Sequence, residues 1–167
     1  MVLKAPNGFI QHQKHGAGFT FIELLVSVAI VMVVTGGIVA NYNTYNDTQK
    51  ARNAILTVKN NLRLIQSRAY NGDKPASGCS ELKGYQVTFA ANLYSMQASC
   101  TEGLAGEGKT VTLESGLAFS PVPSTILFGV LSRGIASDVT ITVTGASQSF
   151  QFRVMRSGDM SEVTLSP

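Results

Sequence analysis

The chain has 167 residues, of which 44% are hydrophobic and only 14% are charged. This length suits one small anchored domain, and the formal net charge of +3 is too small to argue for a nucleic-acid partner on charge alone. Two lysines lie in residues 1–18, so the rest of the chain is close to neutral, with 11 Lys and Arg against 10 Asp and Glu.

Residues 1–18 form a basic leader that contains both histidines of the chain and no acidic residue. A secretory signal peptide places its apolar region before the cleavage site, whereas here the apolar run follows Gly18. This order predicts cleavage on the cytoplasmic side, with the apolar segment retained. The small residues 16–18 leave room for a peptidase to approach the backbone closely. The alternative is an uncleaved anchor with a chance glycine.

The run from Phe19 to Ala40 is apolar except for Glu23. As a helix, its 22 residues would span about 33 Å, enough for the hydrocarbon core of a bilayer. The basic leader favours a cytoplasmic N-terminus, although Lys50 and Arg52 beyond the anchor oppose that orientation. A carboxylate in such a segment is costly and therefore indicates a function for Glu23. The alternative is a protonated glutamate that snorkels to the interface.

The stretch Gly18–Val26, which follows the basic leader, resembles the processing site of type IV prepilins and of the pseudopilins of type II secretion. The resemblance implies cleavage after Gly18 by prepilin peptidase, N-methylation of Phe19 and polymerisation through the N-terminal helix. It also implies that Glu23 pairs with the Phe19 amine of a neighbouring subunit, which would select one axial register. Residues 126–165 are loosely similar to FimT-like minor pilins and H-type pseudopilins.

Gly36 and Gly37 interrupt the anchor near its end. Each glycine lowers helix stability by about 1 kcal/mol relative to alanine, so this pair is a hypothetical point where the helix loosens in a filament. The alternative is close helix packing through small residues.

Residues 41–71 are expected to continue as an amphipathic helix that ends near Asn71–Gly72, with Pro75 beyond it. Arg52, Lys59 and Arg63 are expected on a solvated face. Alternatively, that face binds a polyanion or the acidic part of the next subunit. Six apolar residues recur at alternating spacings of four and three and predict one buried stripe: Ala51, Ile55, Val58, Leu62, Ile65 and Ala69.

From Gly84 the pattern changes to the alternation of strands, which predicts a β-rich extracytoplasmic domain over residues 72–167. The resulting fold class is α+β, with a long N-terminal helix packed on an antiparallel sheet, as the pilin resemblance also implies. The expected strands are Tyr85–Phe89, Tyr94–Ala98, Thr110–Glu114, Thr125–Val130, Asp138–Thr144, Ser149–Met155 and Met160–Leu165.

Cys79 and Cys100 bracket the first predicted hairpin. In an exported domain an even pair indicates a disulfide, worth roughly 3 kcal/mol for a loop of about 20 residues. A redox or metal role is disfavoured because there is no CxxC spacing and no companion histidine.

Gly103–Thr110 matches the pattern of a phosphate-binding P-loop. The chemistry requires a helix after the loop, whereas strand-like alternation follows, so this segment is interpreted as a glycine-rich loop between strands. No catalytic triad, carboxylate pair or zinc cluster remains, which predicts a protein that is not an enzyme and has no metal, cofactor or small-molecule substrate.

The sequence therefore predicts a filament subunit, made as a single-pass inner-membrane precursor and assembled into an extracellular filament or a periplasmic pseudopilus. Its expected partners are identical or related pilin subunits, the prepilin peptidase and methylase, and the inner-membrane assembly platform. One alternative is a type II secretion pseudopilin. Another is a minor pilin that binds DNA for uptake, with Arg133, Arg153, Arg156 and Lys109 as phosphate contacts, although the favoured interpretation of these cations is ordinary exposed charges.

Overall fold

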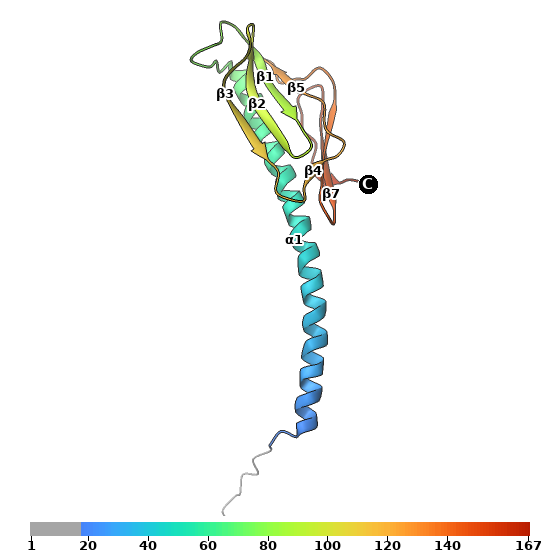
Figure 1. Cartoon of the computed structure of the whole chain (residues 1–167). Coiled ribbons are helices and arrows are strands. Elements are labelled where there is room, and N and C mark those ends of the chain that lie inside the picture. The colour runs from blue at the N-terminus through green and yellow to red at the C-terminus, as the bar shows by residue number, and fades with distance from the viewer. Residues whose placement is uncertain (1–17) are drawn as a thin grey trace, which may run out of the picture. The chain divides into compact units, whose positions relative to one another are not determined.

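The computed structural model describes residues 18–167, except for the side chains of residues 37–41 (Figure 1). Residues 1–17 of the predicted leader lie outside the described residues. The chain divides into two compact units, residues 1–40 and residues 41–167. The described residues form one helix and eight strands, which confirms the predicted α+β class.

Helix α1 (Phe21–Asn71) ends through a glycine cap. Gly72 has a φ of 68°, and its amide donates to the carbonyl of Ala69 at 3.1 Å, while the amide of Asp73 donates to the carbonyl of Arg68 at 3.0 Å. These two bonds make a Schellman motif, which satisfies carbonyls that a helix end leaves free. The helix therefore stops where the sequence predicted.

One face of α1 packs on the strands within residues 41–167. All six residues of the predicted stripe are at most 4% exposed, and they share one hydrophobic cluster with side chains from the strands. Burying each of the larger ones stabilises the fold by roughly 1.5–3 kcal/mol. The confirmed stripe comprises Ala51, Ile55, Val58, Leu62, Ile65 and Ala69.

Lys59 contradicts the prediction of a solvated basic face. Arg52 and Arg63 are exposed, but only 8% of Lys59 is exposed, and its ammonium donates a 2.6 Å hydrogen bond to the carbonyl of Ser161. Burial and the nearby charge of Arg63 lower the pKa of Lys59, while Glu162 opposes that shift. Helical periodicity cannot show that a distant C-terminal segment covers this position.

Four antiparallel strands form the first sheet in the order β3-β2-β1-β5 (Figure 1). Strands β1 (Leu82–Phe89) and β2 (Leu93–Cys100) make the predicted hairpin. Strand β3 (Gly103–Thr112) pairs with β2, and β5 (Ile126–Gly129) pairs with β1. Every second side chain of β2 is buried, so one face of this sheet contributes to the core.

A second antiparallel sheet has the order β4-β6-β7-β8. It contains β4 (Ala118–Phe119), β6 (Val139–Thr144), β7 (Ser149–Val154) and β8 (Thr164–Leu165). The sequence predicted a single sheet, whereas the strands divide between two. Alternation identifies a strand and its buried face but does not say with which strand it pairs.

The aromatic side chain of β4 joins the two sheets. Phe119 packs edge-on against Phe89 and Tyr94 of the first sheet, with ring centres 5.3 and 6.0 Å apart. Tyr94 is fully buried, and its hydroxyl accepts a 2.6 Å hydrogen bond from the amide of Asn61 on α1. Burial raises the pKa of Tyr94. This contact fixes helix and sheets around one core.

The glycine-rich segment predicted as a loop is the first part of β3, so that prediction is wrong. The pairing of β3 with β2 shifts register between Met96 and Ala98, where the side-chain amide of Gln97 donates to the carbonyl of Gly106 at 3.0 Å. Gly106 has a φ of 73°, as an irregularity in an edge strand permits. A strand here is incompatible with the loop-to-helix turn of a P-loop.

The last predicted strand, Met160–Leu165, is also wrong in extent. Met160 forms an isolated bridge with Val154, and only β8 pairs with β7. Between them, the amide of Arg153 donates to the hydroxyl of Ser161 at 2.9 Å, and the amide of Ser161 donates to the carbonyl of Arg153 at 2.9 Å. Side-chain bonding thus replaces part of the expected ladder.

Candidate functional site

Gly18 and Phe19 precede the helix and are both exposed. No atom lies within 4 Å of the position that a Cβ on Gly18 would take. The peptide bond between the two residues is therefore open to a peptidase, as the predicted cleavage requires. Cleavage and methylation themselves stay predictions.

Thr20 caps the first turn of α1. The amide of Glu23 donates to the Thr20 hydroxyl at 3.3 Å, and the amide of Leu24 donates to the Thr20 carbonyl at 3.2 Å. Thr20 is thus the N-cap residue and Glu23 lies at N3; only the Thr20 half of a capping box is formed, and a carboxylate at N3 interacts favourably with the helix dipole. The Thr-x-x-Glu spacing was a sequence signal for this cap, which the prediction of an assembly role for Glu23 did not use.

The carboxylate of Glu23 is exposed and forms no hydrogen bond or ion pair within residues 18–167. Its neighbours along the helix are apolar, so water or a group from another molecule must satisfy it. The predicted pairing with a neighbouring amine is one way to supply such a group.

The first turns of α1 carry a continuous apolar surface. Every large apolar side chain from Phe19 to Val34 is at least 44% exposed. The hydroxyls of Ser27 and Thr35 donate to helix carbonyls at 2.7 Å each, so they are satisfied within the helix. An apolar surface of this extent marks contact with lipid or with another protein.

Within the part of the chain that the structure describes, no helix combines the length and the hydropathy needed to cross a membrane. The membrane-spanning segment predicted for residues 19–40, and the segment boundaries after residues 18, 40 and 71, stay predictions.

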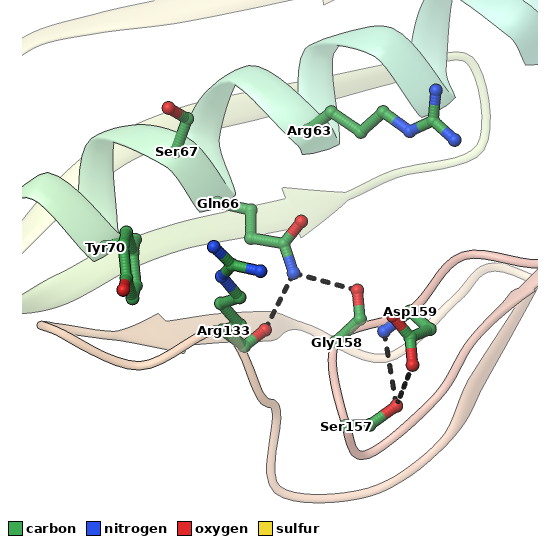
Figure 2. Close-up of a pocket in the computed structure, with 8 residues that line it drawn as sticks. All are labelled: Arg63, Gln66, Ser67, Tyr70, Arg133, Ser157, Gly158 and Asp159. Carbon is green, nitrogen blue, oxygen red and sulfur yellow. Dashed lines mark hydrogen bonds between the residues drawn. The ribbon is translucent and has the colours of Figure 1, made fainter.

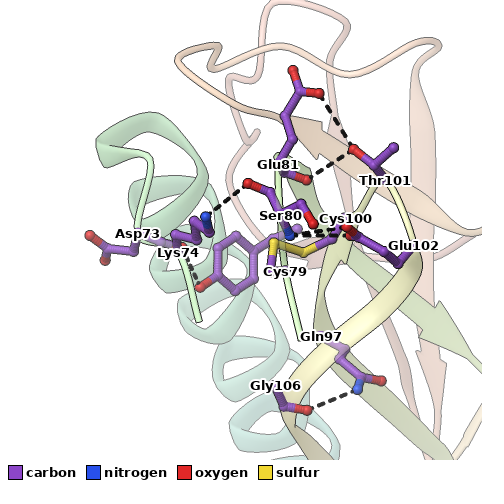
Figure 3. Close-up of a disulfide and its surroundings, with 11 residues drawn as sticks. Asp73, Lys74, Cys79, Ser80, Glu81, Gln97, Cys100, Thr101, Glu102 and Gly106 are labelled. Carbon is purple, nitrogen blue, oxygen red and sulfur yellow. Dashed lines mark hydrogen bonds between the residues drawn. A yellow bond between two sulfur atoms is a disulfide. The ribbon is translucent and has the colours of Figure 1, made fainter. Parts of the chain in front are cut away.

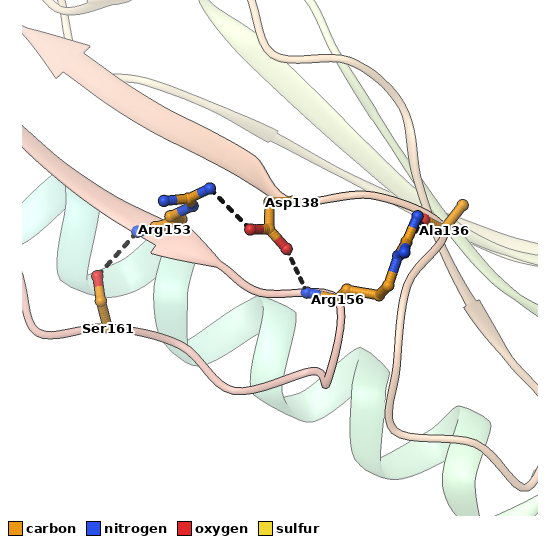
Figure 4. A network of polar contacts seen from close by, with 5 residues as sticks. All are labelled: Ala136, Asp138, Arg153, Arg156 and Ser161. Atoms are coloured by element: carbon orange, nitrogen blue, oxygen red, sulfur yellow. Dashed lines mark hydrogen bonds and ion pairs between the residues drawn. The ribbon is translucent and has the colours of Figure 1, made fainter.

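Two of the arginines predicted to contact DNA are engaged within the domain (Figure 4). The guanidinium of Arg153 pairs with the Asp138 carboxylate at 2.7 Å. The other oxygen of Asp138 accepts a 2.6 Å hydrogen bond from the backbone amide of Arg156, whose Nε donates to the carbonyl of Ala136 at 3.0 Å. These contacts assign both arginines a role in the fold. Lys109 lies exposed on β3, and DNA contact by any of these residues stays a prediction.

Arg133 lies apart from that network, at a groove of about 250 Å³ beside α1 (Figure 2). Its guanidinium carbon is 4.7 Å from the centre of the Tyr70 ring. The side-chain amide of Gln66 donates to the carbonyls of Arg133 and Gly158 at 2.8 Å each, which ties both loops to the helix. The groove is lined by Arg63, Gln66, Ser67, Tyr70, Arg133, Ser157, Gly158 and Asp159.

The sequence prediction included Arg133 but missed the rest of this groove. Gln66 is 67 and 92 residues from its two partners, and no local pattern marks contacts at such separations. Arg63 was assigned to a solvated helix face, and its exposure agrees with that assignment. Its place opposite a turn near the C-terminus has no signal in the sequence.

The predicted pair Cys79 and Cys100 is joined in a disulfide, with a Cα–Cα distance of 5.4 Å (Figure 3). It ties the segment after α1 to the end of β2. The Lys74 ammonium donates to the carbonyl of Ser80 at 2.8 Å, and the Ser80 amide lies 3.2 Å from each carboxylate oxygen of Glu102. Hydrogen bonds from Ser80 lower the pKa of Glu102. The loop is therefore held by several contacts besides the disulfide.

Within residues 18–167, no three His, Cys, Asp or Glu side chains gather where they could hold a metal ion. The two histidines, His12 and His15, lie outside the described residues.

A family model described as the prokaryotic N-terminal methylation motif matches residues 13–39. The matched range contains Gly18, Phe19 and Glu23. The match supports the predicted resemblance of the N-terminal segment to type IV pilin and pseudopilin precursors. Comparison with curated proteins and with solved structures gave no match. The closer likeness to FimT-like or H-type subunits stays a prediction.

Proposed function

We propose that this chain is a prepilin, cleaved after Gly18 and methylated on Phe19, whose mature form assembles into a type IV pilus-like filament through the N-terminal part of α1. The observation that carries the proposal is the unbroken exposure of the large apolar side chains from Phe19 to Val34. In water such a surface would be unfavourable by about 25 cal/mol for each square ångström. Lipid before assembly, and neighbouring subunits after it, would cover the surface.

The hydroxyl groups within this surface agree with an environment that excludes water. Ser27 and Thr35 donate to the carbonyls four residues earlier, so neither needs a water partner. Glu23 is the exception, because its carboxylate finds no partner in the described chain. Cleavage after Gly18 would create an amine on Phe19, which stays cationic after methylation and can neutralise Glu23 of an adjacent subunit. An unpaired carboxylate would be costly there, so pairing would set the subunit register.

The processing step is tested by intact mass and N-terminal sequencing of the protein recovered from sheared surface filaments. We expect a chain that begins at methylated Phe19. An intact Met1 or Val2 start in cells with a working prepilin peptidase would contradict the proposal. Gly18→Leu should block cleavage without disturbing the fold, since open space surrounds Gly18. Gly36→Ala, also in open space, is the matched control and should be processed normally.

The assembly step is tested by Glu23→Gln. The cap uses the backbone amide of Glu23 and the Thr20 hydroxyl, so this variant removes the charge and retains the cap. We expect normal cleavage and loss of filaments, measured by shearing and by membrane fractionation. Glu114→Gln, an exposed carboxylate in the other unit, is the control. Normal filaments from Glu23→Gln would exclude the ion pair as the element that sets the register.

The same processed chain could serve as a pseudopilin of type II secretion, which would occur at trace level in sheared fibres and lie in a secretion gene cluster. In the DNA-uptake alternative, Arg133, Arg153 and Arg156 would bind phosphates with an affinity that falls steeply with salt. In the structure, Arg153 and Arg156 each already bind a partner within the domain. Unchanged DNA retention and salt slope in the Arg153→Gln, Arg156→Gln double variant would exclude the DNA-uptake alternative.

A further inference from the structure

The groove beside Tyr70 is more than a gap between loops, because its walls are fixed in place. Gln66 links the carbonyls of Arg133 and Gly158 through one amide nitrogen (Figure 2). A Cβ on Gly158 would collide with the carbonyl oxygen of Arg133, so the two loops touch backbone to backbone. A site built in this way needs little ordering when it binds a ligand.

The loop that carries Arg133 is also held at its start. Leu131 has a φ of 54°, a left-handed conformation that is costly for a side chain of this kind. Its amide donates a 3.0 Å hydrogen bond to the carbonyl of Ala69 near the end of α1. The strained backbone of Leu131 is thus held by its hydrogen bond to the helix. This loop then carries the Arg133 guanidinium to its place over the Tyr70 ring.

The charges of the groove point to a ligand with an acid group. Arg63 and Arg133 are both exposed and take part in no ion pair within the described residues. A guanidinium presents paired N–H donors that match a carboxylate. Arg133 rests on an aromatic ring, which orients the guanidinium without occupying its hydrogen-bond donors.

Asp159 adds a second requirement, for hydroxyl donors on the ligand. One of its oxygens accepts a 2.9 Å hydrogen bond from Ser157, and the other has no partner among the described residues. That oxygen would accept from a hydroxyl group but would repel a phosphodiester, which offers no donor. A ligand with hydroxyl groups and a single carboxylate satisfies both Arg133 and Asp159, whereas a DNA backbone satisfies only Arg133.

The volume of about 250 Å³ suits one ring rather than an extended chain, and Tyr70 is 45% exposed, leaving apolar ring surface for C–H groups. We propose that this groove binds a uronic-acid unit of an acidic polysaccharide, with Arg133 on the carboxylate, Asp159 on ring hydroxyls and Tyr70 beside the ring. Arg63, whose side chain points away from Arg133 in Figure 2, adds positive charge at the other side of the groove. This binding would give the globular part of the protein a ligand of its own, independent of filament assembly.

The test is binding of fluorescent trigalacturonate to the full chain in detergent, with its carboxyl-reduced, neutral form as the control ligand. We expect binding of the acidic form only. Arg133→Gln should weaken it about tenfold, as expected for losing a charged hydrogen bond, and Arg63→Gln should weaken it less, because Arg63 contributes only through its charge. Arg52→Gln, an exposed arginine of the same helix outside the groove, should have no effect. Thermal unfolding of each variant verifies that the fold is retained.

Three results would overturn the proposal. The first is equal binding of the neutral form, and the second is no binding of trigalacturonate at millimolar concentration. The third is displacement by inorganic phosphate or a short DNA duplex at equal concentration with the same dependence on Arg133, which would identify a general anion groove. Because the assay needs neither cleavage nor polymerisation, its failure would leave the proposed filament function intact.

Discussion

Lys59 and Ser161 lie 102 residues apart in the chain and are joined by a 2.6 Å hydrogen bond from the ammonium to the backbone carbonyl. The ammonium also lies 6.0 Å from the centre of the Phe152 ring. Through this contact, α1 holds the segment that follows β7. The contact also requires a charged group to be buried, which is unfavourable and is the cause of the lowered pKa of Lys59.

The first prediction concerns Lys59→Met, which removes the charge and retains an apolar stem. The folded-state pKa of Lys59 lies below the ordinary lysine value of 10.5. At neutral pH the group is charged in both states, so the wild type carries the cost of burying the charge. As pH rises through the lowered pKa towards 10.5, the folded state loses the proton first and that cost disappears. The stability of the wild type relative to the variant should therefore increase in this window.

The measurement is denaturant unfolding of both proteins from neutral pH to about 11. Tyr85 and Tyr94, whose pKa values burial raises, contribute a loss of stability at alkaline pH, but equally in the two proteins. Only the difference between the proteins reports on Lys59. A difference that does not vary with pH would contradict this account.

The second prediction compares two glycines with nearly the same backbone conformation. Gly158 has a φ of 90° and Gly116 a φ of 87°, but only at Gly158 would a Cβ collide with backbone, at the carbonyl of Arg133. Gly116→Ala should cost about 1–2 kcal/mol, the cost of a left-handed conformation alone. Gly158→Ala should cost at least about 2 kcal/mol more, because the loops must separate. Equal shifts of the unfolding midpoint in the two variants would show that the loops of Gly158 and Arg133 separate at little cost.

The third prediction concerns the disulfide between Cys79 and Cys100. These cysteines are separated by 21 residues, so replacing both with serine should reduce the free energy of unfolding by roughly 3 kcal/mol. Lys74 and Glu102 hold the same loop through Ser80, so its amides should keep part of their protection from hydrogen exchange. Wild-type protein under reducing conditions is the control and should behave as the double variant does. An unchanged free energy of unfolding would mean that the contacts of Lys74 and Glu102 hold the loop without the disulfide.

The fourth prediction concerns Asp138, which binds a guanidinium with one oxygen and a backbone amide with the other. Asp138→Ala should cost about 1–2 kcal/mol, chiefly from the charged hydrogen bond to the Arg156 amide. Arg153→Gln should cost under about 1 kcal/mol, because that ion pair is exposed. Asp47→Ala, which breaks an exposed pair with Lys50 at 3.5 Å, is the control and should have almost no effect. Equal losses at Asp138 and Asp47 would contradict this ranking.

Local patterns made much of this structure predictable. The apolar stripe from Ala51 to Ala69, the cap at Gly72 and the β1–β2 hairpin all depend on neighbours within a few residues, so periodicity and turn chemistry indicate them. The N-terminal motif around Gly18 and Glu23 is equally local, and the methylation-motif match covers it.

Other features depend on contacts across most of the chain. The burial of Lys59, the groove at Gln66 and the division into two sheets each require partners dozens of residues away, which no window of sequence specifies. The glycines of β3 led to the wrong prediction of a loop for a related reason. Glycine marks irregular backbone, and whether that irregularity is a loop or a bulge depends on the strand opposite.

Strands β4 and β5 are consecutive in the chain but belong to different sheets. In a chain that emerges N-terminus first, the first sheet is complete once β5 pairs with β1, whereas β4, which is made before β5, has no pairing strand until β6 follows. A protein truncated after β5 would keep all four strands of the first sheet, yet leave Phe119 of β4 without its pairing strand. The two sheets are thus not exchangeable modules. Recombination between related genes would preserve this domain only if the exchanged segment carried β4 and β5 together.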